Sequence, residues 1–164
     1  MRLSYEDLSR SGGADLGVSR PFLVDQERID RFADLTEDHQ WIHVDRALAA
    51  KSRFGSTIAH GYLTLSLVAA VLSELLVVRD AAFAVNYGLD RVRFPAPLRS
   101  GASVVGTARV VAATSLPGCV QVVVRVEMRE GPADKPVCVA DSVLRFYQSL
   151  PEEGHDSRTH PAYH

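Results

Sequence analysis

Cysteine is scarce in this chain of 164 residues, and the common metal-binding patterns are absent. The two cysteines, Cys119 and Cys138, lie in apolar runs typical of strands. They indicate buried free thiols in a reducing compartment, with a disulfide as the alternative. Neither a CxxC nor an HExxH spacing is present, so the sequence predicts no metal site.

Charge of one sign is not in excess either. A formal net charge of −2 excludes the basic footprint of a nucleic-acid-binding protein and a polybasic membrane patch. Apolar residues make up 46% of the chain, as in ordinary soluble globular proteins. The N-terminal stretch MRLSYEDLSRSGGAD lacks an apolar signal segment. We therefore expect a cytoplasmic protein with one domain large enough to bury a core.

One long apolar run is present, IAHGYLTLSLVAAVLSELLVV at residues 58–78. It is nearly long enough to span a bilayer. However, it opens with His60 and Gly61, and Glu74 lies near its end. These residues favour a helix buried on most sides inside a soluble domain over a membrane-spanning one. We expect this helix at about residues 61–78.

Short helical patterns precede this run. Ser4 and Asp25 are predicted N-caps of helices in SYEDL and VDQERIDRFADLT, and Asp45 is the predicted N-cap of a third in HVDRALAAKS. RPFLV predicts a short strand, and the polar stretch before Asp45 predicts a loop. Residues 1–17 are interpreted as an N-terminal extension with a short helix.

From Ala82 onward, β-rich runs recur at a spacing of about ten residues. They are AFAVNYGLDRVRF, SVVGTARVVAAT, CVQVVVRVEMRE and VCVADSVLRFY. Antiparallel strands with one apolar face, following an apolar helix, predict an α+β domain over residues 18–148 whose sheet wraps around the helix. A curved sheet leaves an open edge, which pairing in a homodimer would cover. The polar tail 149–164 is predicted to be disordered.

Two polar stretches indicate chemistry. LTEDHQWIHVD, residues 35–45, contains Asp38 and His43, and a carboxylate with an imidazole can hold a water and move its protons. FGSTIAHG, residues 54–61, leads into the long helix, whose N-terminal N–H groups can stabilise negative charge on a carbonyl oxygen. Gly61 lets a ligand approach the backbone closely. Together these features suit hydration of an α,β-unsaturated thioester, whereas Asp38 and His43 alone also fit a turn residue and a hydrogen-bonded polar group.

The stretch FADLTEDHQWIHVDRALA, followed by FGSTIAHGYLTLSL, resembles the MaoC-like (R)-specific enoyl-CoA hydratases and dehydratases of the hotdog superfamily. The positions that match the hydratase motif of that family are Phe32, Thr36, Asp38, Ile42, His43 and Ala49. Glu37, Gln40 and Trp41 stand where the family has Gly, Asn and Pro. DHQWIHVD together with NYGLDRVRFPAPLRSG resembles the nodulation-protein-N-like subgroup.

This resemblance implies a hotdog fold, an antiparallel sheet around a long central helix, and a homodimer. It implies that Asp38 and His43 bind the reacting water and that the Gly61 N–H meets the thioester oxygen. The implied activity is reversible hydration of trans-2-enoyl thioesters of coenzyme A or acyl carrier protein in fatty-acid metabolism, with no metal or redox cofactor. A non-catalytic acyl-thioester-binding module and an acyl-CoA thioesterase are the alternatives. Glu37 in place of Gly implies a less tight turn.

Five further residues are possible pocket residues, namely Gln40, Trp41, His60, Asn86 and Tyr87. Gln40 keeps the amide of the family's Asn but reaches one methylene further. Trp41, Asn86 and Tyr87 either line an acyl pocket or only pack the loop and the strand. His60 is expected to serve the entry of the long helix rather than the chemistry.

Overall fold

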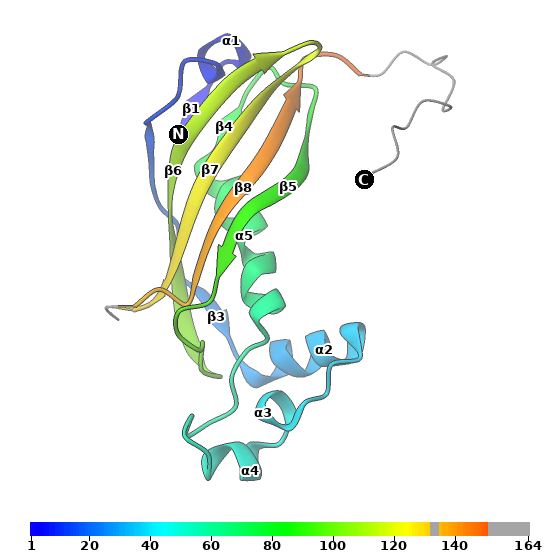
Figure 1. Ribbon diagram of the computed structural model, residues 1–164, viewed down its shortest axis with the longest axis vertical. Helices are drawn as coiled ribbons and strands as arrows, with labels where there is room; N and C mark the ends of the chain where they lie inside the picture. The colour runs from blue at the N-terminus through cyan, green and yellow to red at the C-terminus, as the bar shows by residue number, and fades with distance from the viewer. Residues whose placement is uncertain (132–134, 151–164) are drawn as a thin grey trace.

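The computed structural model describes residues 1–131 and 135–150 and has the predicted α+β architecture, with long antiparallel strands curved around one helix (Figure 1). The helices are α1 (Tyr5–Leu8), α2 (Gln26–Thr36), α3 (Trp41–Val44), α4 (Arg46–Ala50) and α5 (Gly61–Leu75). The strands are β1 (Arg2–Leu3), β2 (Asp15–Val18), β3 (Phe22–Val24), β4 (Val77–Val78), β5 (Phe83–Arg93), β6 (Ala102–Leu116), β7 (Cys119–Glu130) and β8 (Cys138–Tyr147). Most of the tail predicted to be disordered, residues 151–164, lies outside the described residues.

The main sheet is antiparallel, with strand order β2-β6-β7-β8-β5, and β3 also pairs with β6. The apolar face predicted for these strands is confirmed in β7, where Val122, Val124, Val126 and Met128 are fully buried. Strand β5 ends the sheet and pairs only with β8 among the described strands. Its outer edge is therefore open, as the sequence predicts.

Helix α5 fills the concave side of this sheet. Its buried face includes Leu63, Val68, Val71 and Leu72, which belong to one apolar cluster with the inward residues of β6, β7 and β8. No helix in the described part of the chain is long and apolar enough to cross a membrane. The helix is therefore a core element, as the interrupted apolar run indicates.

The predicted C-terminal end of this helix, at residue 78, is wrong. Helix α5 ends at Leu75, and Leu76 adopts an extended backbone. Val77 and Val78 form β4, which pairs in parallel with β1 at the N-terminus. The apolar pattern continues past the helix because Val77 and Val78 belong to a second, two-stranded sheet, in which β-branched side chains are favoured.

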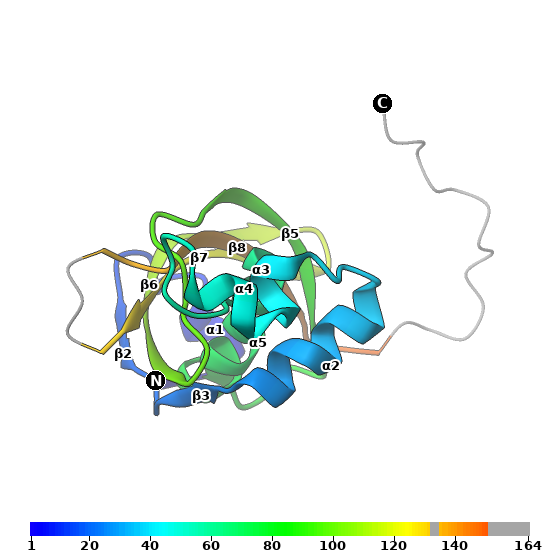
Figure 2. The same cartoon turned by 90° about the horizontal axis from the view of Figure 1, so that it is seen from below.

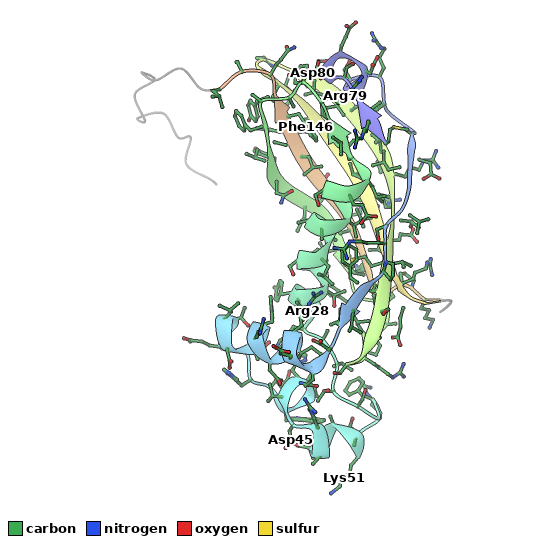
Figure 3. The ribbon with its side chains drawn as sticks, turned by 180° about the vertical axis from the view of Figure 1, so that it is seen from behind. Arg28, Asp45, Lys51, Arg79, Asp80 and Phe146 are labelled. Atoms are coloured by element: carbon green, nitrogen blue, oxygen red, sulfur yellow. The ribbon has the colours of Figure 1, made fainter. Side chains whose placement is uncertain are left out.

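Helices α2, α3 and α4 gather at one end of the molecule, beside the start of α5 (Figures 1 and 2). The predicted N-caps are confirmed, because the side chains of Ser4, Asp25 and Asp45 each accept a backbone N–H of the following turn. Asp45 marks this end in Figure 3, whereas Asp80, which accepts the Tyr5 backbone N–H at 2.6 Å, lies at the opposite end. The polar stretches of the sequence therefore meet at the α2–α4 end.

Both cysteines are buried and free, which confirms the prediction from their apolar surroundings. Burial raises the pKa of the Cys138 thiol to about 11, so this side chain stays protonated and unreactive at neutral pH.

Candidate active site

Three side chains converge where α2–α4 meet the start of α5. One side-chain ligand atom from each of Asp38, His43 and His60 lies within 4.8 Å of the others. His43 and His60 are buried, whereas Asp38 is exposed. The sequence predicted the pairing of Asp38 with His43, and the structure brings in His60 from a separate segment.

The turn that carries Asp38 is tight. Helix α2 ends at Thr36, and Glu37 follows with φ of 59° and ψ of 18°, the left-handed conformation. Glu37 is the only non-glycine residue with positive φ among the described residues. The expected looser turn is therefore wrong, because Glu37 keeps the backbone shape that glycine would adopt. A non-glycine residue held in this conformation carries strain, as is common near functional sites.

Replacing Glu37 with glycine is expected to raise the free energy of unfolding by about 0.5–1 kcal/mol. Glycine relieves the left-handed strain, and part of this gain is offset by the greater freedom of glycine in the unfolded chain. Glu27→Gly, on the exposed face of α2, is the matched control and should lower stability by about 1 kcal/mol. Urea unfolding measures the free energy of unfolding of both variants. If Glu37→Gly is no more stable than the wild type, Glu37 is not strained.

Helix α3, a single turn, positions His43. The sequence predicted a loop here, but Trp41–Val44 are helical, and the His43 backbone N–H donates to the Gln40 carbonyl at 2.9 Å. The His43 Nδ1 lies 2.7 Å from the Ile58 carbonyl oxygen. A carbonyl can only accept, so Nδ1 carries the hydrogen and Nε2 of the neutral ring offers a lone pair.

The environment of His43 favours this neutral form. Burial lowers the pKa of the imidazole below its usual value, and the neighbouring His60 acts in the same direction. The hydrogen bond to Ile58 and the charge of Asp38 oppose the shift without cancelling it. At neutral pH the Nε2 of His43 is therefore available as a base beside a carboxylate.

Gln26 fixes the backbone of His43 and was missed by the sequence analysis. Its buried side-chain amide donates to the His43 carbonyl at 2.7 Å and to Asp30 Oδ1 at 2.7 Å, and its oxygen accepts from the Thr57 hydroxyl. A glutamine in the first turn of a helix is ordinarily exposed, so nothing in the sequence distinguishes it. The residue joins α2, α3 and the segment before α5.

A cavity of about 340 Å³ opens beside this cluster. It is lined by Ile42, His43, Ile58, Ala59, Gly61, Thr64, Phe94, Ala96, Pro97, Leu98 and Val137. The first hydrogen bond within α5 joins the Thr64 N–H to the His60 carbonyl, so the N–H of Gly61 has no acceptor within the helix. A side chain at Gly61 would begin 3.1 Å from the Phe94 ring. This mostly apolar cavity therefore holds an imidazole and a helix N-terminus.

The remaining predicted pocket residues lie away from this cavity. Gln40 and Trp41 are exposed, and the Gln40 side chain makes no capping hydrogen bond for α3. Tyr87 of β5 is half-exposed, and the Arg145 guanidinium lies 3.3 Å from the centre of its ring. Asn86 lines a second cavity of about 340 Å³ between α5 and the edge of the sheet, with apolar neighbours that include Leu65, Val68, Ala69 and Leu72.

A carboxylate and two imidazoles could also ligate a metal ion. The rings of His43 and His60 are stacked, however, with centroids 3.7 Å apart and planes inclined by 25°. A ring lone pair lies in the plane of its ring, and nearly parallel planes cannot both contain one ion about 2.0 Å from each nitrogen. The arrangement suits a hydrogen-bonded water better than a metal ion.

Comparison with known proteins identifies the family. Residues 9–131 match the family described as MaoC like domain. The chain belongs to this family. It is 42% identical over 144 residues to 3-hydroxyacyl-thioester dehydratase Z of Mycobacterium tuberculosis, covering 87% of this chain and 95% of the relative. It is 41% identical over 138 residues to Nodulation protein N of Rhizobium meliloti, covering 80% and 86% of the two chains.

The fold of this MaoC-like protein is likewise confirmed as the hotdog fold. The structure of an R-hydratase from Pseudomonas aeruginosa superposes with a TM-score of 0.68 over 90% of this chain and 87% of that chain, at 23% identity. The predicted family, fold and nodulation-protein-N-like resemblance are thus confirmed.

Proposed function

We propose that this MaoC-like protein is a 3-hydroxyacyl-thioester dehydratase that also catalyses the reverse reaction, (R)-specific hydration of trans-2-enoyl thioesters. The observation that carries the proposal is the buried His43, with a lone-pair Nε2, beside Asp38 and the cavity where α5 begins. The 42% identity to a dehydratase over most of both chains supports it.

The thioester oxygen accepts a hydrogen bond from the Gly61 N–H in this proposal. The first turn of α5 adds a partial positive charge at the same place. As water adds, electron density moves from the double bond onto the thioester oxygen, which gains enolate character. A donor fixed in position before the reaction stabilises this charge at no further cost of reorganisation.

Asp38 and His43 hold the water that adds. The water donates its hydrogens to the carboxylate and to Nε2, which directs its oxygen toward the β-carbon. One proton passes to the pair as the carbon–oxygen bond forms, and the pair returns one proton to the α-carbon. The sum is H–OH across the double bond, and dehydration is the reverse sequence. Asp38 and His43 are treated as one titrating unit in this scheme.

The acyl chain is expected to run along α5 into the cavity bordered by Ala69 and Asn86. Ala69 also borders a neighbouring cavity of about 180 Å³ further along the helix. Ala69→Leu should therefore lower kcat/KM for a long trans-2-enoyl-CoA about tenfold, because the larger side chain would collide with the acyl chain. The value for crotonyl-CoA should stay unchanged, because its short chain does not reach this cavity. Equal loss on both substrates, measured in parallel assays, contradicts this placement.

The proposed active form is a homodimer paired through β5. This strand of 11 residues carries exposed apolar side chains, including Val85, Tyr87 and Leu89, beside an open backbone edge. Such an edge is ordinarily covered, and a second copy covers it symmetrically. Light scattering should report twice the chain mass. The free buried cysteines favour a reducing compartment such as the cytoplasm.

The proposed activity is tested by incubating the protein with crotonyl-CoA and a longer trans-2-enoyl-CoA. Hydration removes the absorbance of the conjugated double bond and releases no thiol. Release of free coenzyme A would instead identify a thioesterase. Unchanged substrate together with measurable acyl-CoA binding would identify a non-catalytic binding module, and either result overturns the proposal.

A further inference from the structure

We infer that His60 is a positioning residue that fixes both Asp38 and His43, rather than only the entry of helix α5. The inference rests on the proposed hydration for its kinetic part. Its geometric part rests on contacts that His60 makes with the two residues separately.

The first contact is with the backbone of Asp38. His60 Nε2 lies 2.9 Å from the Asp38 carbonyl oxygen, across 22 residues of sequence. Since the carbonyl can only accept, Nε2 of His60 carries a hydrogen and donates it. The exposed turn that bears the Asp38 carboxylate is thereby tied to a residue that is only 2% exposed.

The second contact is with the ring of His43. The two imidazoles stack at 3.7 Å between centroids, and the Phe32 ring lies 5.1 Å from that of His60. His43 is also fixed at Nδ1 by Ile58. The hydrogen bond to Ile58 and the stacked His60 ring together set the direction in which His43 Nε2 points. His60 therefore holds the two proton-transfer groups in one mutual arrangement.

His60 exerts this effect without lining the cavity. His60 does not border the cavity beside His43, although its sequence neighbours Ala59 and Gly61 do. Its buried Nδ1 has no hydrogen-bond partner among the described residues. A buried polar atom without a partner costs free energy. A helix-capping role does not explain this cost, because the His60 side chain makes no capping hydrogen bond for α5.

The titratable groups around His43 give this arrangement a measurable signature. The loop contributes Asp38 and the start of α5 contributes His60, and α2 contributes Asp30 through the Gln26 amide. Burial lowers the pKa of His43, and His60 lowers it further. Removing the His60 ring exposes His43 to solvent, so the His43 pKa rises toward its usual value. The acid limb of the pH–rate profile should then move to higher pH.

Two substitutions separate the roles. His60→Gln keeps an N–H near the position of Nε2 and can still donate to Asp38, whereas His60→Asn is too short to do so. We expect kcat to fall about a hundredfold in His60→Asn, the cost of a small misplacement of reacting groups, and less in His60→Gln. KM should stay nearly constant, because His60 does not border the cavity. Ser11→Ala, which removes a buried hydroxyl bonded to Leu8 far from the site, is the control for lost stability.

The decisive measurement is an NMR titration of the His43 ring in the wild type and both variants, with the pH dependence of kcat alongside. A raised His43 pKa in both variants, with partial recovery of kcat in His60→Gln, supports the inference. An unchanged His43 pKa, or loss of rate only in proportion to lost stability, overturns it. If the wild type hydrates no enoyl thioester, the proposed function fails, while the titration still decides whether His60 acts on His43. If neither variant folds, the NMR titration of the wild type decides. The inference is overturned if the His43 ring signals do not change while the His60 ring titrates.

Discussion

Asp38→Asn and His43→Gln are each expected to lower kcat for hydration of crotonyl-CoA at least a hundredfold. Each substitution removes one of the two groups that hold the water, and the loss of an acid–base group costs about this much or more. Neither substitution changes the volume of the side chain much, so the cavity keeps its shape. The rate of loss of double-bond absorbance, in protein shown to be folded by circular dichroism, measures the effect.

The same region supplies matched controls. Asp34 and His39 are exposed and contact each other at 3.0 Å, beside the same turn but outside the cluster. Asp34→Asn and His39→Gln should therefore leave kcat within a factor of about two, as surface changes usually do. Because Asp38 and His43 act on one water, the double variant should lose little more than either single variant. Activity within tenfold of wild type in either single variant would contradict the assignment.

Gly61→Ala is expected to lower kcat/KM by about a hundredfold, which is the cost of losing one donor to a developing oxyanion. The new methyl group would lie 3.1–3.3 Å from three carbons of the Phe94 ring. Either the ring moves into the cavity or the start of α5 shifts, and in both cases the N–H no longer meets the thioester oxygen. Stopped-flow or steady-state kinetics with crotonyl-CoA give the ratio.

A second substitution distinguishes the two consequences of Gly61→Ala. Phe94→Leu in the same chain removes the ring and should restore part of kcat/KM if crowding is the cause. Gly12→Ala is the control, since a Cβ there meets nothing within 4 Å. Wild-type kinetics in Gly61→Ala would show that the thioester oxygen binds elsewhere.

The sequence predicted those parts of the fold that repeat a local pattern. The apolar face of β7, the apolar run of α5 and the capping residues Ser4, Asp25 and Asp45 each specify structure over a few residues, and all are confirmed. The predicted end of α5 is wrong because Val77 and Val78, which follow the helix, pair with β1 at the N-terminus of the chain. A local apolar pattern does not reveal such a partner.

The site divides in the same way. Asp38 and His43 are close in sequence and matched a motif, so their pairing could be expected before the structure. The contacts that fix these two residues could not be predicted, because Gln26 contacts His43 across 17 residues of sequence and His60 contacts Asp38 across 22. Both contacts end on backbone carbonyls, which every residue possesses. No residue type at either end marks the pairing in the sequence.

The configuration of the product at its β-carbon distinguishes the proposed hydration from its alternatives. Wild-type protein is incubated with trans-2-enoyl-CoA, and the 3-hydroxyacyl product is separated on a chiral column against both enantiomers. A single water held by Asp38 and His43 reaches one face of the double bond, so we expect one enantiomer with its thioester intact. The proposed specificity makes this the (R)-3-hydroxyacyl thioester. The (S) product, a racemic mixture or the free acid would contradict it.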